Sequence, residues 1–164
     1  MLNETVLTPE EISPGQTLEQ ALLESGMIVT GIRGVSMKPM LDMKTDRIIV
    51  VPLTGKPKRG DVVLYRRGGS YVLHRVIEVL DGKYRIRGDN CTGDEFVGAD
   101  ALIGRLASVL RGNDCIEITE QYSEKYFRAA ETTLPFRRMK AAARRAAGRF
   151  VRKCRIGSGT KTEH

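Results

Sequence analysis

The chain has 164 residues, of which 41% are apolar and 29% are charged, and its formal net charge is +7 at pH 7. This length suits a single domain with its own core, and the composition is that of a folded globular protein. Aromatic residues make up only 5% of the chain, and tryptophan is absent, which disfavours a base-stacking surface. No apolar run reaches the roughly 20 residues that a transmembrane helix needs.

The N-terminal residues 1–16 are acidic, contain two prolines and have no apolar core. They predict an irregular arm rather than a secretory signal. A short helix is predicted to begin at Thr17, which with Gln20 fits a capping box, and to end at Gly26. Without an export signal we expect a cytoplasmic protein with reduced cysteines. The cysteines are Cys91, Cys115 and Cys154.

Short β-branched runs alternate with glycine-rich and charged breaks from residue 27 to about residue 120. Asp81-Gly82, between two alternating runs, is a strong hairpin signal. The predicted strands lie in MIVTGIR, RIIVV, DVVLYRR, SYVLHRVIEVL, KYRIRG, LIGRLASVLR and CIEIT. About seven short strands in this stretch predict a mainly β (α+β) domain, either an antiparallel barrel or a folded sheet.

The C-terminal part of the chain has a helical and basic pattern. Residues 121–131 predict one helix, Pro135 interrupts the pattern, and residues 134–155 predict a second, amphipathic helix. Residues 132–162 contain ten Lys and Arg and no acidic residue, whereas residues 1–131 contain 17 basic and 19 acidic residues. The positive charge of the chain therefore belongs to this tail.

Three interpretations of residues 134–155 stay open. The helix packs an apolar stripe that includes Phe136, Met139 and Phe150 on the β domain, with its arginines solvated. Alternatively, it binds the surface of an anionic membrane as a peripheral anchor, which would place the protein at the inner membrane face. Nucleic-acid binding through phosphate contacts is the least favoured, because no recognition fold and no interleaved aromatic residues accompany the basic residues.

Three polar clusters interrupt the predicted strands. Ser36 follows a strand in a proline-bearing turn, His74 lies on a largely apolar strand face, and residues 88–95 form an acidic strand exit. A serine hydroxyl becomes a good nucleophile when histidine takes its proton, and an acid behind the histidine stabilises the imidazolium. The clusters thus allow a catalytic triad. A turn serine, a core histidine and a solvated acidic turn are the alternative interpretation.

The motifs together resemble the signal peptidase I family, within the group of Ser-His and Ser-Lys peptidases (S24 and S26) that includes LexA-type self-cleaving repressors. GVSMKPML resembles the family's serine motif, and KPKRGDVVLYR resembles its Gly-Asp-Val-Val strand. VLHRVIEV resembles the strand of the subclass that uses histidine, KYRIRGDNCTGDEF its Gly-Asp-Asn box, and ALIGRLASVL the closing strand. These motifs occur in the family's order and cover residues 30–110.

The resemblance implies a catalytic, barrel-like β domain over residues 27–120, of the signal peptidase and LexA type. This domain lies between an N-terminal arm with a short helix, residues 1–26, and a helical basic tail, residues 121–164. Ser36 is the implied nucleophile and His74 the implied general base. No metal or cofactor is implied.

The resemblance also implies a third acid shortly after the Gly-Asp-Asn aspartate. Asp94 is preferred for this role over the neighbouring Glu95, and Asp89, inside the box, is expected to be structural or a second orienting acid. The amide of Ser36 is expected to serve the oxyanion hole. Met37 is expected to line a shallow pocket that prefers small residues near the cleaved bond of an extended peptide.

Three features depart from the family. Lysine does not occupy the base position, Cys91 stands where the box of the histidine subclass usually has a second asparagine, and the transmembrane anchor of familiar members is missing. We therefore expect a serine endopeptidase that cleaves an extended peptide or leader segment in the cytoplasm or at a membrane surface.

Two alternatives stay open. The first is a non-catalytic peptide-binding module on the same fold. The second is a LexA-like self-cleaving regulator, which would need a DNA-binding domain and an internal cleavage segment. We expect neither to fit within the 35 residues before Ser36.

Overall fold

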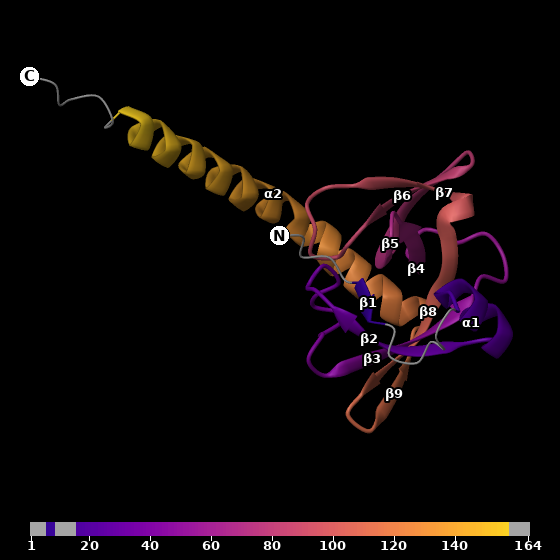
Figure 1. Cartoon of the computed structure of the whole chain (residues 1–164). Coiled ribbons are helices and arrows are strands. Elements are labelled where there is room, and N and C mark those ends of the chain that lie inside the picture. The colour runs from indigo at the N-terminus through magenta and orange to yellow at the C-terminus, as the bar shows by residue number, and fades with distance from the viewer. Residues whose placement is uncertain (1–5, 9–15, 158–164) are drawn as a thin grey trace, which may run out of the picture.

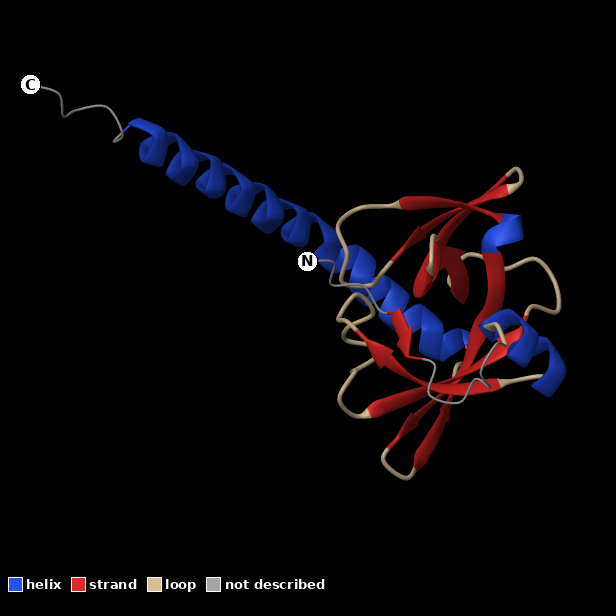
Figure 2. Cartoon of the chain, viewed as in Figure 1, coloured by secondary structure: helices blue, strands red, loops and turns tan. Residues whose placement is uncertain are grey.

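The computed structural model describes residues 6–8 and 16–157, with side chains described for residues 16–147. These residues form one antiparallel sheet, a short helix near the N-terminus and a long helix at the C-terminus (Figures 1 and 2). The sheet has nine strands among the described residues. They are β1 (Val6–Thr8), β2 (Ile28–Arg33), β3 (Asp46–Pro52), β4 (Val62–Arg67), β5 (Ser70–Leu80), β6 (Lys83–Arg87), β7 (Glu95–Gly98), β8 (Leu102–Arg111) and β9 (Asp114–Glu117).

The strand order is β1-β2-β3-β8-β4-β5-β6-β7, with β9 paired to β8 beside this path. The sheet folds back on itself, since Val6 of β1 also pairs with Val72 of β5. One pair of residues does not make a continuous ladder, and the sheet is open rather than a closed barrel. The structure therefore confirms the mainly β antiparallel fold, in its folded-sheet form, and the barrel alternative is wrong.

All seven predicted strands are present, and the turn residues between them behave as expected. Asp81-Gly82 joins β5 to β6, where Leu80 pairs with Lys83 and Gly82 has a φ of 66°, a value that glycine adopts without strain. The sequence pattern missed β1 and β7, which have only three and four residues. A 3₁₀ turn, η1 (Ala99–Ala101), joins β7 to β8.

The short helix α1 (Leu18–Ser25) has the predicted ends. The Gln20 amide donates to the Thr17 hydroxyl at 3.2 Å, the Gln20 side chain accepts from the Thr17 amide at 2.9 Å, and Gly26 ends the helix with a φ of 73°. Leu18 and Leu22 are buried in a core that also contains residues of β2, β3, β4, β5 and β8. The helix therefore closes one end of this core.

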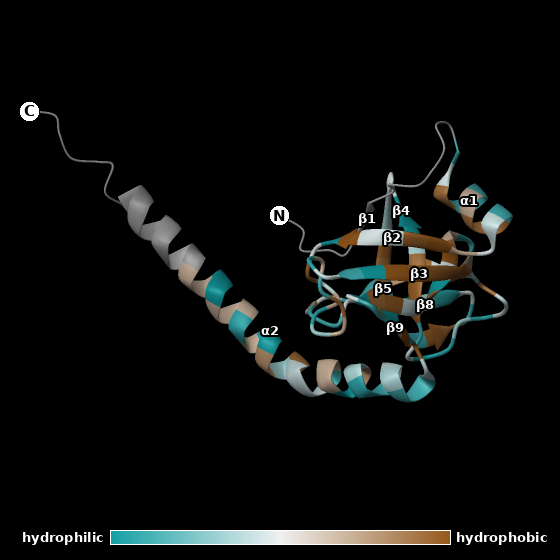
Figure 3. Ribbon diagram, turned by 90° about the horizontal axis from the view of Figure 1, so that it is seen from below, coloured by the Kyte–Doolittle hydropathy of each residue, from teal (hydrophilic) through white to brown (hydrophobic). Residues whose placement is uncertain are grey.

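The C-terminal residues form one helix, α2 (Glu120–Gly157), so the predicted break at Pro135 is wrong. Proline removes one backbone hydrogen bond and its ring bends a helix, but the residues around it can stay helical. The Arg137 side chain donates to the carbonyl of Ala130 at 2.6 Å, and the Thr133 hydroxyl donates to that of Ala129 at 2.8 Å. Figure 3 shows that α2 bends after its first turns and continues.

Only the first part of α2 packs on the sheet. Its buried residues are Ser123, Phe127, Ala130 and Leu134. Phe136 and Met139 are each 62% exposed, and the helix projects away from the sheet (Figure 1). The expected packing of the apolar stripe on the β domain is therefore wrong for these two residues, and Phe150 and Cys154 lie outside the described side chains. No helix of the described residues is long and apolar enough to cross a membrane.

Strand β5 lies at the centre of the fold, with six consecutive buried residues from Val72 to Ile77. Because side chains alternate along a strand, His74 and Arg75 project from opposite faces of the sheet. These two polar side chains, each at most 1% exposed, must both find partners inside the protein.

Candidate active site

Ser36 and His74 lie in contact. Ser36 is in the turn that follows β2, a turn that also contains the cis peptide bond between Lys38 and Pro39. The Ser36 Oγ is 3.1 Å from the Nε2 of His74 on β5, and each residue is 1% exposed. The fold therefore brings together two residues that are 38 positions apart in the chain, within hydrogen-bond distance.

The other ring nitrogen of His74 faces Tyr65 and Glu95. The Tyr65 hydroxyl is 3.1 Å from His74 Nδ1, and Glu95 Oε1 is 3.5 Å from the same nitrogen. Tyr65 donates its only hydroxyl proton to Glu95 Oε2 at 3.0 Å. Its oxygen must therefore accept the hydrogen bond from Nδ1–H. This assignment leaves Nε2 of a neutral His74 unprotonated and able to take the proton of Ser36.

Glu95 is held as a carboxylate. The hydrogen bond with His74 lowers its pKa to about 2, despite partial burial, and Arg67 and Tyr65 act in the same direction. Arg67 Nη1 lies 3.1 Å and 3.2 Å from the two carboxylate oxygens. Burial and the charge of Glu95 raise the pKa of Tyr65, so Tyr65 keeps its proton. A negative charge therefore lies behind His74, where it can stabilise an imidazolium.

The structure places Glu95 beside His74 and does not bring the preferred residue, Asp94, to it. Asp94 Oδ1 accepts a hydrogen bond from Arg87 at 2.6 Å, and its other oxygen lies 3.9 Å from Arg138 and 4.0 Å from Arg85. Successive residues in extended backbone project in opposite directions, so Asp94 turns to these arginines and Glu95 turns to His74.

Asp89 lies on the other side of β5 from His74 and binds Arg75. The Arg75 guanidinium donates to both Asp89 oxygens at 2.7 Å, and both residues are buried. Arg75 also donates to the Gly60 carbonyl at 2.8 Å and to the Ser123 hydroxyl at 2.5 Å. The pair thus joins β5, the turn after β6, the turn before β4 and α2. This position supports a structural role for Asp89.

The turn after β6 holds the Ser36 turn in place. The Asn90 amide donates to the Ser36 carbonyl at 2.6 Å, and the Asn90 side chain donates to the Val35 carbonyl at 3.2 Å. Cys91 donates its amide to the Gly88 carbonyl at 2.8 Å. Burial raises the pKa of the Cys91 thiol, which favours the uncharged form.

Gly88 allows the two turns to approach closely. A Cβ at this position would lie 2.8 Å from the Ser36 carbonyl oxygen and 2.9 Å from Ser36 Cβ. We therefore expect Gly88→Ala to displace Ser36 and to lower the free energy of unfolding by about 1–3 kcal/mol, measured by urea denaturation. Gly93→Ala is the matched control, because nothing lies within 4 Å of its Cβ position. Equal stability of the two variants would contradict the close approach.

Met37 does not line a surface pocket. Its side chain is 0% exposed and belongs to the core that α1 closes. The expectation that Met37 contacts substrate is therefore wrong for this conformation. The residue following Ser36 anchors the turn in the core instead.

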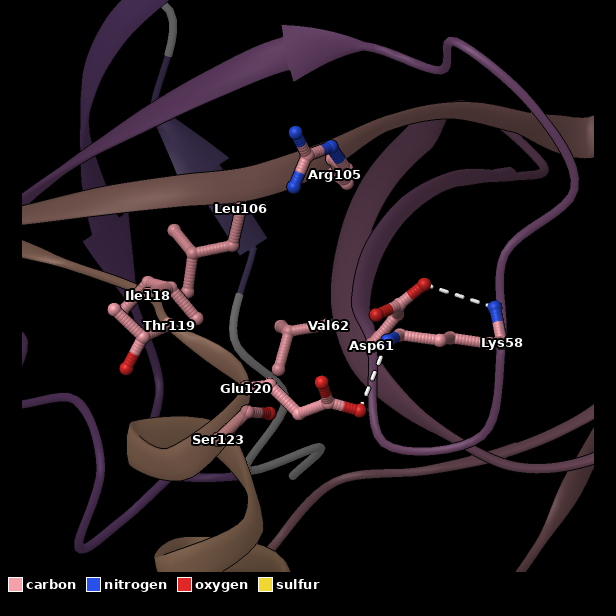
Figure 4. A pocket seen from close by; sticks show the side chains of 9 residues that line it. All are labelled: Lys58, Asp61, Val62, Arg105, Leu106, Ile118, Thr119, Glu120 and Ser123. Carbon is pink, nitrogen blue, oxygen red and sulfur yellow. Dashed lines mark hydrogen bonds and ion pairs between the residues drawn. The ribbon is translucent and has the colours of Figure 1, made fainter.

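A pocket lies between β8, the turn before β4 and the start of α2 (Figure 4). Two of its carboxylates bind Lys58, since Lys58 Nζ lies 2.9 Å from Glu120 and the Lys58 amide donates to Asp61 at 2.8 Å. Neither Ser36 nor His74 lines it. Within the described part of the chain, no group of three or more His, Cys, Asp or Glu side chains converges as a metal site.

Tyr65 and Arg67 were missed in the sequence. The two-residue turn Gly68-Gly69 sets the register of β4 and β5, in which Val63 pairs with His74 and Tyr65 pairs with Val72. Tyr65 and His74 therefore share a face of the sheet as diagonal neighbours. The length of this turn is the sequence signal that could have predicted that Tyr65 lies beside His74.

No protein-family model and no curated protein matches the sequence.

The depressed pKa of Glu95 predicts a dependence of stability on pH. Its ordinary value is 4.5 and its value in the folded protein is about 2, so this contribution is present above pH 4.5 and is lost as the pH falls towards 2. We expect urea denaturation to show a smaller loss of stability over this window for Glu95→Gln than for the natural protein. Equal losses would show that Glu95 is not held as a carboxylate.

Proposed function

We propose that the protein is a serine endopeptidase, similar to signal peptidase I of the histidine subclass, that cleaves an extended peptide or leader segment. The observation that carries the proposal is the connected set of hydrogen bonds that joins Ser36 Oγ to His74, His74 to Tyr65, and Tyr65 to Glu95. This order of groups, with a hydrogen-bond acceptor and a carboxylate behind the imidazole and a hydroxyl in front of it, is the one that serine-histidine catalysis uses.

In the proposed mechanism Ser36 Oγ attacks the carbonyl carbon of the peptide while His74 Nε2 takes its proton. The C–N bond then breaks, and the same proton passes from Nε2 to the leaving amine. Water next attacks the carbonyl carbon of the acyl-enzyme ester and gives a proton to His74 Nε2. The bond between that carbon and Ser36 Oγ then breaks, His74 returns the proton to Oγ, and the carboxylic acid leaves. The amide of Ser36 is the proposed donor to the oxyanion.

Tyr65 and Glu95 act in this mechanism through His74. The Tyr65 oxygen holds Nδ1–H and thus keeps Nε2 free for the Ser36 proton. The carboxylate of Glu95 stabilises the imidazolium that forms after proton transfer. Both are positioning residues, since both act through the imidazole of His74.

The test combines a fluorophosphonate probe, which forms a covalent bond with an activated serine, with a library of peptides derived from a proteome. We expect the natural protein to label at Ser36 and to cleave a subset of the peptides. Both signals should vanish in Ser36→Ala and His74→Ala and persist in Ser70→Ala, which changes an exposed serine at the start of β5. Labelling and cleavage that survive in Ser36→Ala would contradict the proposal.

The burial of Ser36 and His74 favours one alternative, a non-catalytic peptide-binding module. In that case peptides would bind, but neither labelling nor cleavage would occur. The LexA-like alternative is tested in the same experiment by measuring the intact mass of the purified chain, which shows whether the chain has cleaved itself. Self-cleavage of the natural chain that is absent in Ser36→Ala would support that alternative.

We further propose that the projecting part of α2 binds an anionic membrane surface. Phe136 and Met139 lie exposed on a helix whose exposed basic residues farther along include Lys140, Arg144 and Arg145. Arg137 and Arg138 instead donate to the carbonyls of Cys91 and Thr92 in the β domain. Exposed apolar side chains beside basic ones match a lipid surface, where each basic residue contributes about 1 kcal/mol and apolar residues insert. Phosphate contacts with nucleic acid would need the basic residues only.

Membrane binding is measurable with vesicles that contain phosphatidylserine. Arg144→Gln with Arg145→Gln should weaken vesicle binding about 30-fold, since two residues contribute about 2 kcal/mol. The matched control is Lys56→Gln with Lys83→Gln, two exposed lysines of the β domain, which should leave binding unchanged. Retention on nucleic acid without retention on vesicles would favour the nucleic-acid interpretation instead.

A further inference from the structure

Strand β1 lies between the two strands that lead to the candidate active site. It pairs with β2 through Val6 with Arg33, Leu7 with Ile32 and Thr8 with Gly31. Val6 also pairs with Val72 of β5. Residues from the beginning of the chain thus join β2 and β5 across a gap in the folded sheet.

This gap adjoins Ser36 and His74. Arg33 precedes Ser36 by three residues, and Val72 precedes His74 by two. Strand β4 pairs with one edge of β5 throughout Ser70–Arg75, so β1 and β6 must share the other edge. On that edge β6 pairs from Arg75 onward and β1 meets Val72, so His74 lies between them.

Without β1, the edges of β2 and β5 beside the active site would present unpaired backbone groups. Such edges bind extended peptides by adding a strand. Val6, Leu7 and Thr8 include two β-branched residues, which favour extended backbone. Ser36 and His74 are each 1% exposed in the conformation that contains β1, whereas cleavage requires that a substrate reach them.

We propose that residues 6–8 occupy the place of the peptide substrate, so that the N-terminal segment blocks the site as an intramolecular strand that a substrate must displace. The inference rests on the proposed peptidase function and adds the regulation of its site. A tethered segment has an effective concentration on the order of millimolar, so weakly binding peptides are excluded and only peptides that pair better with β2 and β5 gain access.

The test uses full-length chains that carry Ser36→Ala, so that binding is measured without cleavage. A second chain adds Val6→Pro and Leu7→Pro, which remove two backbone donors and disfavour strand pairing. The probe is a fluorescent peptide with the sequence NETVLTPEEI, residues 3–12 of the chain. We expect the proline chain to bind it at least about tenfold more tightly, by fluorescence anisotropy.

Matched controls separate opening of the site from loss of folding. Val6→Ile with Leu7→Val keeps residues that suit a strand and should bind the peptide as weakly as the parent. Urea denaturation checks that the proline chain is folded. Unchanged peptide binding by a folded proline chain overturns the proposal.

Hydrogen exchange of the natural full-length protein gives a readout that needs no variant. Amides of the segment that contains residues 6–8 should be protected, and rapid exchange of that segment overturns the proposal.

Failure of the peptidase function is distinguishable from failure of this inference. In chains that retain Ser36, the proline substitutions should increase the rate of fluorophosphonate labelling at least about tenfold, because a blocked site opens. Tighter peptide binding with no labelling of either chain would support the blocking strand and refute the peptidase. Equal labelling of both chains, without tighter binding, would support an activated serine and refute the blocking strand.

Discussion

Glu95→Gln is expected to lower kcat/KM for peptide cleavage by about 10²- to 10⁴-fold, the range seen when the acid behind a catalytic histidine is neutralised. The variant keeps the size of the side chain but removes the charge 3.5 Å from His74 Nδ1. The imidazolium that forms during the reaction would then lack its stabilising anion. The loss should appear in kcat, because this charge interaction strengthens as the proton is transferred.

Asp94→Asn is the matched control for this prediction. Its carboxylate binds Arg87 and not His74, so kcat/KM should change less than about threefold. The chemical shift of the His74 Nδ1–H proton, measured by NMR, reports directly on the surroundings of the imidazole. It should change in Glu95→Gln and stay the same in Asp94→Asn. A larger loss of kcat/KM in Asp94→Asn than in Glu95→Gln would indicate that Asp94, and not Glu95, is the acid that supports His74.

Asp89→Asn is expected to lower the free energy of unfolding by about 3–5 kcal/mol. The Arg75 side chain is 0% exposed, and the substitution would leave its charge buried without a counter-ion. Because Arg75 also binds Gly60 and Ser123, the turn before β4 and the start of α2 should loosen together. Urea denaturation monitored by circular dichroism measures the effect.

Two further variants show whether the buried charge is the cause. Glu120→Gln breaks the exposed ion pair with Lys58 and should cost less than about 1 kcal/mol. Arg75→Met with Asp89→Leu removes both buried charges and should recover a large part of the stability that Asp89→Asn loses. A loss below 1 kcal/mol in Asp89→Asn would contradict the structural role of the pair.

The sequence does not predict which of two adjacent carboxylates, Asp94 or Glu95, lies beside His74. Both lie at a suitable distance after Asp89, and neither residue type is better suited to orient a histidine. The choice depends on which side chain β7 turns toward β5. The sequence pattern did not predict β7, because four residues at an acidic turn carry no clear alternation.

Pro135 illustrates a different kind of error. Proline disfavours a helix interior through one missing hydrogen bond and one steric clash, which are local effects. Other interactions stabilise the helix on both sides of this proline. Phe127, Ala130 and Leu134 are buried against the sheet, and Arg137 donates a hydrogen bond to the Ala130 carbonyl. The helix therefore continues with a bend, and its basic part leaves the sheet.

Residue patterns along the chain are enough to predict seven of the nine described strands, their glycine turns, the capped helix α1 and the separation of a nearly neutral body from a basic tail. These features follow from interactions between residues close in the chain. The folded structure was needed to show that Glu95 faces His74, that Tyr65 hydrogen-bonds to both, that Met37 is buried and that β1 pairs with both β2 and β5. These contacts depend on strand register and burial, which join residues far apart in the chain.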